Sequence, residues 1–257
     1  MGLFGKKQKS DYSGSITDIH CHILPGVDDG AKSMEQSMEM IDIAHENGID
    51  TIIATPHHMP EGGNVSPTGI RERVSKLQAY ADERDYDMTI LPGNEIYYHS
   101  DVAEMLEEKQ ICTLAGSSCV LVEFSPMDES RYIRNSLAEL QNMGYTPIVA
   151  HVERYASLLK SPFEKIQELR DMGILIQVNA ASVMGGFGKP TKAIAEKLLK
   201  NRLVDFIGTD AHSSGTRSPK VRECVEYLNS KYPADYVEDL LYGNAEKYIF
   251  SQMSPDD

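Results

Sequence analysis

Cysteine is scarce in this chain of 257 residues. The four cysteines, at positions 21, 112, 119 and 224, form no C-x-x-C pair. They are typical of buried thiols in a reducing compartment, so we expect a cytoplasmic protein. None of the four is followed by arginine six positions later. This absence excludes the C-x5-R phosphate loop of cysteine-dependent phosphatases.

Long apolar runs and an excess of positive charge are also missing. No segment approaches the roughly 20 apolar residues that a membrane helix needs, and the start lacks the long apolar core of a signal peptide. We therefore expect no direct membrane insertion. The formal net charge of −14 argues against broad nucleic-acid binding. We expect residues 1–14 to form a flexible tail and residues 15–257 to form one domain, because 41% hydrophobic content can bury a substantial core.

Short apolar runs alternate with amphipathic segments along the rest of the chain. The predicted strands cover about residues 15–21, 51–55, 88–91, 119–122, 147–150, 174–178 and 204–208, and a helical segment follows each. Apolar strands of this kind, each followed by a helix, indicate a parallel sheet covered by helices. About seven such units predict an α/β barrel of the TIM type. An open doubly wound sheet is the alternative, but no G-x-G-x-x-G follows any strand.

Histidine, aspartate and glutamate lie at or just after the ends of these strands. In the first strand His20 and His22 are separated by one residue, so both point to the same side and can bind one divalent cation. The full candidate set is His20, His22, Asp29, His57, Glu95, Glu123, His151, Asp210 and His212. In a barrel the carboxyl ends of the strands open on one face. Packed carboxylates repel one another unless cations neutralise them, and nine ligands are too many for one ion, so we expect two or three ions.

The segment Asp18–His22 resembles the opening D-x-H-x-H motif of the polymerase and histidinol phosphatase (PHP) superfamily. With the following Asp28–Ala31 turn, it is similar to the manganese-dependent protein-tyrosine phosphatases of bacterial capsule and exopolysaccharide loci. The resemblance continues in four further motifs, Ala54–His58, Leu91–Glu95, Ala150–Arg154 and Thr209–His212.

The resemblance implies a distorted (β/α)7 barrel with three metal ions. It implies that Glu95 bridges the first two ions. The implied ligand sets are His20, His22, Glu95 and Asp210 for the first ion, Glu95, Glu123 and His151 for the second, and Asp29, His57 and His212 for the third. It also implies that Arg154 and Arg217 bind phosphate. The implied substrate is the phosphotyrosine tail of a bacterial tyrosine kinase that controls capsule or exopolysaccharide synthesis.

The reaction expected from these residues is attack of metal-activated water on phosphorus, without a phosphoenzyme. Manganese is the expected ion, although iron, cobalt and zinc also suit oxygen and imidazole ligands. The alternatives are another phosphoesterase of the superfamily, such as a histidinol-phosphate phosphatase or a nuclease, or a catalytically silent metal-binding scaffold. The segment Gly185–Lys189 lacks the G-x-x-x-x-G-K-[ST] pattern of a phosphate loop, and we expect it to form a loop over the barrel mouth.

Overall fold

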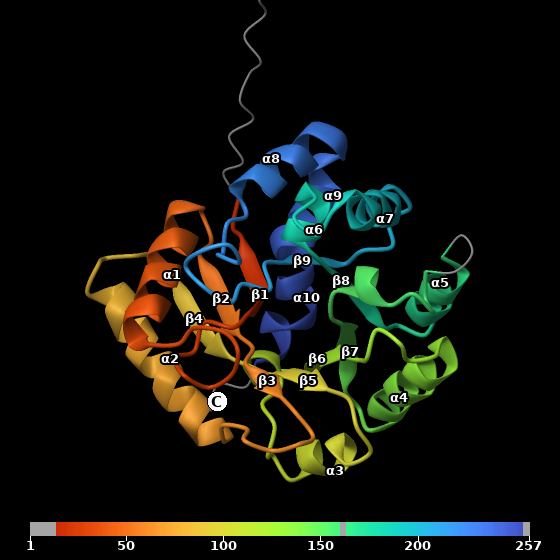
Figure 1. Cartoon of the computed structure of the whole chain (residues 1–257), viewed down its shortest axis with the longest axis horizontal. Helices are drawn as coiled ribbons and strands as arrows, with labels where there is room; N and C mark the ends of the chain where they lie inside the picture. Colours follow the sequence, from red (N-terminus) through yellow and green to blue (C-terminus); the bar gives the residue numbers. More distant parts are fainter. Residues whose placement is uncertain (1–13, 160–162, 254–257) are drawn as a thin grey trace, which may run out of the picture.

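The computed structural model describes residues 14–159 and 163–253. The predicted tail at residues 1–14 lies outside the described residues, except for Gly14. Within the described ranges, no helix combines the length and apolar character needed to cross a membrane. Figure 1 shows the strands near the centre of the molecule and the helices around them.

Parallel strands form a closed ring. The strands are β1 (Thr17–Cys21), β2 (Thr51–Ala54), β3 (His57–His58), β4 (Thr89–Pro92), β5 (Glu95–Tyr97), β6 (Cys119–Glu123), β7 (Thr146–Val149), β8 (Leu175–Asn179) and β9 (Phe206–Gly208). They pair in the orders β1-β2-β4 and β3-β5-β6-β7-β8-β9. The ring closes where the Asp210 N–H donates to His20 O at 2.7 Å and the His22 N–H donates to Ala211 O at 2.8 Å. The predicted (β/α)7 barrel is confirmed.

Two of the seven predicted strands are each followed closely by a second short strand that the sequence did not predict. Only Thr55 and Pro56 separate β2 from β3, and only Gly93 and Asn94 separate β4 from β5. Proline cannot donate to the sheet ladder, so regular pairing stops at Pro56. A Cβ atom on Gly93 would lie 2.9 Å from Leu114 Cδ2, so only glycine allows this close packing. These second strands, β3 and β5, pair with His57 opposite Glu95.

Helices cover the outside of the ring. They are α1 (Met34–Glu46), α2 (Pro67–Asp82), α3 (Val102–Glu107), α4 (Ser130–Asn142), α5 (Glu164–Asp171), α6 (Ala180–Met184), α7 (Lys189–Lys200), α8 (Arg222–Lys231), α9 (Ala234–Glu238) and α10 (Asn244–Tyr248). The Ser33 side chain caps α1 by accepting the Gln36 N–H. Helix α6 is too short, at five residues, to give a periodic pattern in the sequence.

Apolar side chains fill both sides of the strands. Ile53, Leu121 and Ile148 belong to a cluster inside the ring, while Ile52 and Val120 belong to the larger cluster between strands and helices. Successive residues of a strand point to opposite faces, which explains this division. The apolar cluster inside the ring leaves the carboxyl ends of the strands to polar side chains.

Candidate metal centre

The carboxyl ends of the strands bring all nine predicted ligand residues into one cluster. A cavity of about 490 Å³ opens above it, and six of the nine line this cavity: Asp29, His57, Glu95, Glu123, Asp210 and His212. The loop before α2 contributes Met59 and residues 62–64 to the wall. The candidate ligands therefore lie on the face of the barrel that usually carries the active site.

His20 of β1 and His22, directly after it, converge because the strand is irregular. The pairing register of β1 against β2 shifts between Asp18 and Cys21. An irregularity of this kind re-aims side chains, so His20 joins His22 at the strand end while Ile19 remains in the apolar cluster. His20 Nε2 lies 3.2 Å from His22 Nε2. Two imidazole nitrogens at this distance are arranged to share one bound species.

Glu95 lies at the centre of the cluster. Its Oε2 atom is 3.1 Å from both His20 Nε2 and His22 Nε2 and 3.2 Å from His57 Nδ1, and its Oε1 atom is 2.7 Å from His151 Nε2. Burial would raise the pKa of Glu95, but the surrounding histidines hold it well below its usual range. A carboxylate that contacts four imidazoles has the position expected of a bridging ligand.

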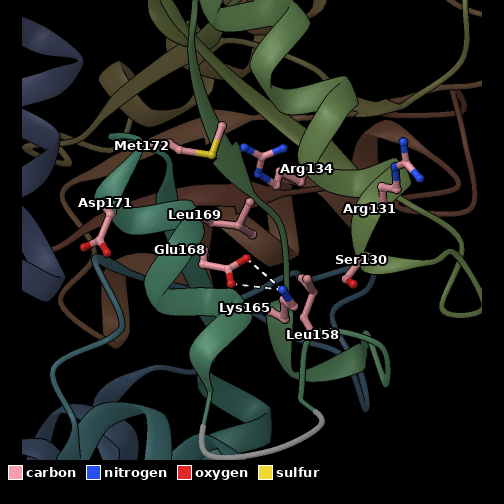
Figure 2. A pocket seen from close by; sticks show the side chains of 9 residues that line it. All are labelled: Ser130, Arg131, Arg134, Leu158, Lys165, Glu168, Leu169, Asp171 and Met172. Atoms are coloured by element: carbon pink, nitrogen blue, oxygen red, sulfur yellow. Dashed lines mark hydrogen bonds and ion pairs between the residues drawn. The ribbon is translucent and has the colours of Figure 1, made fainter.

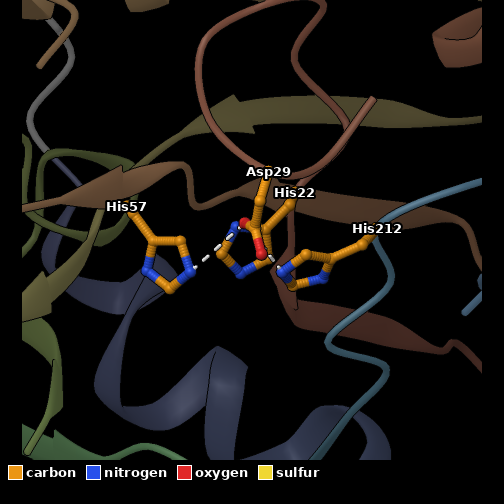
Figure 3. Close-up of side chains that lie close together, drawn as sticks. All are labelled: His22, Asp29, His57 and His212. Atoms are coloured by element: carbon orange, nitrogen blue, oxygen red, sulfur yellow. Dashed lines mark ion pairs between the residues drawn. The ribbon is translucent and has the colours of Figure 1, made fainter. Parts of the chain in front are cut away.

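A second group of ligand atoms lies toward the solvent. Asp29 Oδ1 is 3.5 Å from His57 Nε2 and 3.2 Å from His212 Nε2, and the rings of His22 and His212 are 3.9 Å apart between centroids (Figure 3). The Asp29 side chain is 64% exposed, whereas His22 is buried. One ligand atom from each of these four residues lies within 4.8 Å of the others. This group therefore spans the cluster from its buried floor to its mouth.

His57 also belongs to a third group, with Glu95 and Glu123. Glu123 Oε1 lies 3.0 Å from His57 Nδ1, and Glu123 Oε2 lies 3.6 Å from His151 Nε2. The family resemblance implies that His57 and Glu123 bind different ions. In the structure the two nitrogens of His57 face two different groups, so this ring lies between them.

Asp210 is the contact point for the two predicted phosphate-binding arginines. Arg154 donates to Asp210 Oδ2 at 2.6 Å, and Arg217 donates to Asp210 Oδ1 at 2.9 Å. Asn179 Nδ2 donates to Asp210 Oδ2 at 2.8 Å. Burial would raise the pKa of Asp210, but His20 and the other cations around it lower it. Both arginines line the cavity and use only part of their five N–H donors on Asp210.

Asp28 holds two of the histidines in place. Its Oδ2 atom lies 2.8 Å from His22 Nδ1 and accepts the His57 N–H at 3.0 Å, while its Oδ1 atom accepts the Gly30 N–H at 2.8 Å. Burial would raise the pKa of Asp28, but the pair with His22 lowers it to about 2. The sequence placed Asp28 only in a turn of the family motif, whereas the structure shows it in contact with the outer nitrogen of His22.

Sequence reasoning missed Gln177 of β8. Its Oε1 atom accepts the His151 N–H at 2.7 Å and lies 3.2 Å from His20 Nδ1, and its Nε2 atom donates to Asn179 Oδ1 at 2.8 Å. This side chain therefore orients two ligand candidates at once. An amide within a predicted strand gives no metal-binding signal, so only its inward-facing position could have identified it.

The nitrogen and oxygen atoms of this cluster are suited to bind divalent cations. His57 Nδ1 and Glu95 Oε2 are buried, and neither has a hydrogen-bond partner of acceptable geometry within the described residues. Buried polar atoms without partners are costly, and a cation coordinated by these nitrogen and oxygen atoms would satisfy them. Imidazole and carboxylate are ligands shared by manganese, iron, cobalt and zinc.

The four cysteines do not supply a nucleophile. All four are buried. Burial raises the pKa of Cys112 to about 11 and those of Cys119 and Cys224 to about 12, and the pKa of Cys21 is also raised. A reactive cysteine needs the opposite shift, because the thiolate is the nucleophile. The expected absence of cysteine-based chemistry is consistent with this geometry.

Another cavity, of about 620 Å³, lies between α4 and α5 (Figure 2). Arg131, Arg134 and Lys165 line it together with Glu168 and Asp171, and Lys165 pairs with Glu168 at 2.9 Å. This mixture of charges does not form a phosphate site comparable to the strand-end cluster.

Comparison with known proteins identifies the family. A model described as "Capsular polysaccharide synthesis, CpsB/CapC" matches residues 16–250. "Tyrosine-protein phosphatase YwqE" of Bacillus subtilis (strain 168) is 35% identical over 92% of both chains, and "Tyrosine-protein phosphatase CpsB" of Streptococcus pneumoniae is 34% identical over 93% of this chain and all of its own. A solved structure described as one of "unique metal-dependent tyrosine phosphatases" from these two organisms superposes with a TM-score of 0.85 at 34% identity, covering 92% of this chain and 95% of that one. The chain therefore belongs to the CpsB/CapC family of capsular polysaccharide synthesis proteins.

Proposed function

We propose that this protein is a metal-dependent protein-tyrosine phosphatase. The observation that carries the proposal is the cluster of histidines and carboxylates beneath a cavity that also contains Arg154 and Arg217. Two relatives are named tyrosine-protein phosphatases, and they are 34–35% identical to this chain over more than nine-tenths of its length.

Three ligand sets would hold the ions. The sets combine the family resemblance with the side-chain groups described above: His20, His22, Glu95 and Asp210; Glu95, Glu123 and His151, with His57 beside them; and Asp29, His57 and His212, with His22 beside them. We propose manganese as the resident ion. Bound divalent ions would polarise the phosphoryl group and lower the pKa of an attacking water molecule.

The two arginines would bind and orient the phosphoryl group. Both arginines line the cavity and contact Asp210, and guanidinium groups bind phosphate oxygens through paired hydrogen bonds. Positive charge fixed beside the phosphoryl oxygens stabilises the charge that develops on them during the reaction. Asp210 keeps both guanidinium groups oriented, at 2.6 Å from Arg154 and 2.9 Å from Arg217.

A phenol leaving group reduces the need for a proton donor in the site. The pKa of tyrosine is about 10, well below that of an alkyl alcohol, so departure of the phenolate needs less help from an acid. The buried cysteines, with raised pKa values, provide no covalent route. The reaction is therefore direct transfer of the phosphoryl group to water.

We also propose the substrate and the location. The substrate is the phosphotyrosine tail of a bacterial tyrosine kinase that controls capsule or exopolysaccharide synthesis, and the enzyme acts in the cytoplasm. The family description and the names of the relatives support this assignment.

The test uses the purified protein with a phosphotyrosine peptide. Removing metal with a chelator should abolish hydrolysis, adding Mn²⁺ back should restore it, and His20→Ala should prevent restoration. Histidinol phosphate and an oligonucleotide, as competing substrates, should be hydrolysed with a much lower kcat/KM. Full activity without metal would contradict the mechanism, and bound metal without turnover of any phosphoester would favour a silent scaffold.

A further inference from the structure

Phe187 presents an aromatic face at the edge of the candidate site. It lies between α6 and α7, and its side chain is 44% exposed. Its ring centroid is 5.2 Å from Cζ of Arg154, the guanidinium that lines the cavity and contacts Asp210. The proposed function gives Arg154 a phosphate to bind but assigns no role to the ring beside it.

The loop around Phe187 has a fixed backbone. Gly185 and Gly188 have φ values of +90° and +92°, which only glycine adopts readily. The Gly186 N–H donates to Ala181 O at 2.8 Å, and the Gly188 N–H donates to Gly185 O at 2.9 Å. Phe187 is therefore held by its backbone while its ring remains accessible to a ligand.

A buried carboxylate connects this loop to Arg154. Glu153, the residue before Arg154, accepts the Asn179 N–H on Oε1 at 3.1 Å. Asn179 is the N-cap residue directly before α6, and α6 ends at Met184, directly before the loop. The segment that carries Arg154 is therefore hydrogen-bonded to the start of the short helix that leads to Phe187.

Phosphotyrosine, the substrate of the proposed function, has an aromatic ring of its own. With its phosphoryl group at Arg154, a phosphotyrosine ester must extend its ring outward from the cavity floor. Aromatic rings attract each other in offset or edge-to-face arrangements with centroids 4.5–7 Å apart. An accessible, backbone-anchored ring beside the phosphate-binding guanidinium is placed to meet that group.

We propose that Phe187 is a specificity-determining residue that forms a wall for the aryl group of the substrate. The inference rests on the proposed function, and it adds that this chain distinguishes aryl from alkyl phosphates through Phe187. A contact of this kind changes the affinity for an aryl ligand by about 2- to 13-fold, and it leaves an alkyl ligand unaffected.

The experiment compares binding with turnover. Manganese-loaded wild type, Phe187→Ala and Phe187→Tyr are titrated calorimetrically with phenylphosphonate and with methylphosphonate. The kcat/KM values are then measured for a phosphotyrosine peptide and for the phosphoserine peptide of the same sequence. Met184→Ala is the matched control, because Met184 is a 36% exposed apolar side chain at the end of α6.

We expect Phe187→Ala to weaken phenylphosphonate binding about 2- to 13-fold and to raise KM for the phosphotyrosine peptide, with methylphosphonate binding unchanged. Phe187→Tyr and Met184→Ala should resemble the wild type. Equal losses for both phosphonates would mean that Phe187 only positions Arg154, and no loss would mean that the ring makes no contact; either result overturns the proposal. Failure of the wild type to hydrolyse the phosphotyrosine peptide would refute the proposed function, while the phosphonate titrations would still test Phe187.

Discussion

Replacing Asp28 with asparagine should weaken metal binding without removing any proposed ligand. The carboxylate receives three groups: His22 Nδ1 at 2.8 Å, the His57 N–H at 3.0 Å and the Gly30 N–H at 2.8 Å. Asparagine keeps one oxygen, which can serve His22 and His57 on the Oδ2 side. Its NH₂ group must then face the Gly30 N–H, so donor meets donor.

The expected loss follows from these contacts. Partners of metal-bound histidines contribute about 10- to 100-fold in metal affinity, which corresponds to about 1.4–2.7 kcal/mol. The pKa of Asp28 is lowered to about 2, so the charge that stabilises the His22 ring is present at neutral pH. We therefore expect Asp28→Asn to weaken Mn²⁺ binding at least tenfold.

Titration calorimetry with Mn²⁺ measures this effect directly. Asp82→Asn is the matched control, since Asp82 is exposed at the end of α2 and contacts only Gln78 through its side chain among the described residues. Activity of Asp28→Asn should recover at saturating Mn²⁺, because the residue acts through metal affinity. An affinity equal to that of the wild type would show that Asp28 does not support His22 in this way.

Two further predictions concern protons and packing. Burial would lower the pKa values of both His22 and His20. Asp28 and Glu95 nevertheless raise the pKa of His22 to about 10, and Glu95 and Asp210 raise that of His20. The His22 ring therefore holds a proton at pH 7.5 and must release it to bind metal. Calorimetry in two buffers of different ionisation enthalpy should show release of at least about one proton, and affinity should fall as pH falls; binding with no proton release would be inconsistent with these shifts. Gly30→Ala should lower Tm by at least about 3 °C, because the new Cβ would lie 2.3 Å from His22 O. Gly215→Ala, whose Cβ would meet only Ser213 Oγ at 3.7 Å, should change Tm little in the same melting experiment, and equal Tm values for the two variants would refute the packing argument.

The repeated strand–helix pattern and the polar residues at strand ends were sufficient to predict the barrel and the clustering of the ligand candidates. Both are properties of local sequence. The sequence predicted a strand over residues 51–55 but did not predict β3 directly after it, because His57 and His58 show no apolar strand pattern. It also did not predict that the two nitrogens of His57 face different groups, since this depends on the pairing of β3 with β5.

The supporting residues were harder to predict than the ligands. Gln177 and Asn179 lie within a strand whose other residues are apolar, and their alignment with His20 and Asp210 depends on the register of β8 beside its neighbours. The position of Phe187 beside Arg154 likewise depends on three-dimensional packing, because the two residues are far apart along the chain.

The central claim is that the side chains at the strand ends bind divalent ions that activate water. The most direct test is a crystal structure of the protein grown with Mn²⁺, with anomalous diffraction recorded at the manganese edge. The account predicts two or three anomalous peaks around Glu95, with the first in contact with His20 and His22. A crystal grown with Mn²⁺ whose ordered protein shows no anomalous peak in this cluster would contradict the account.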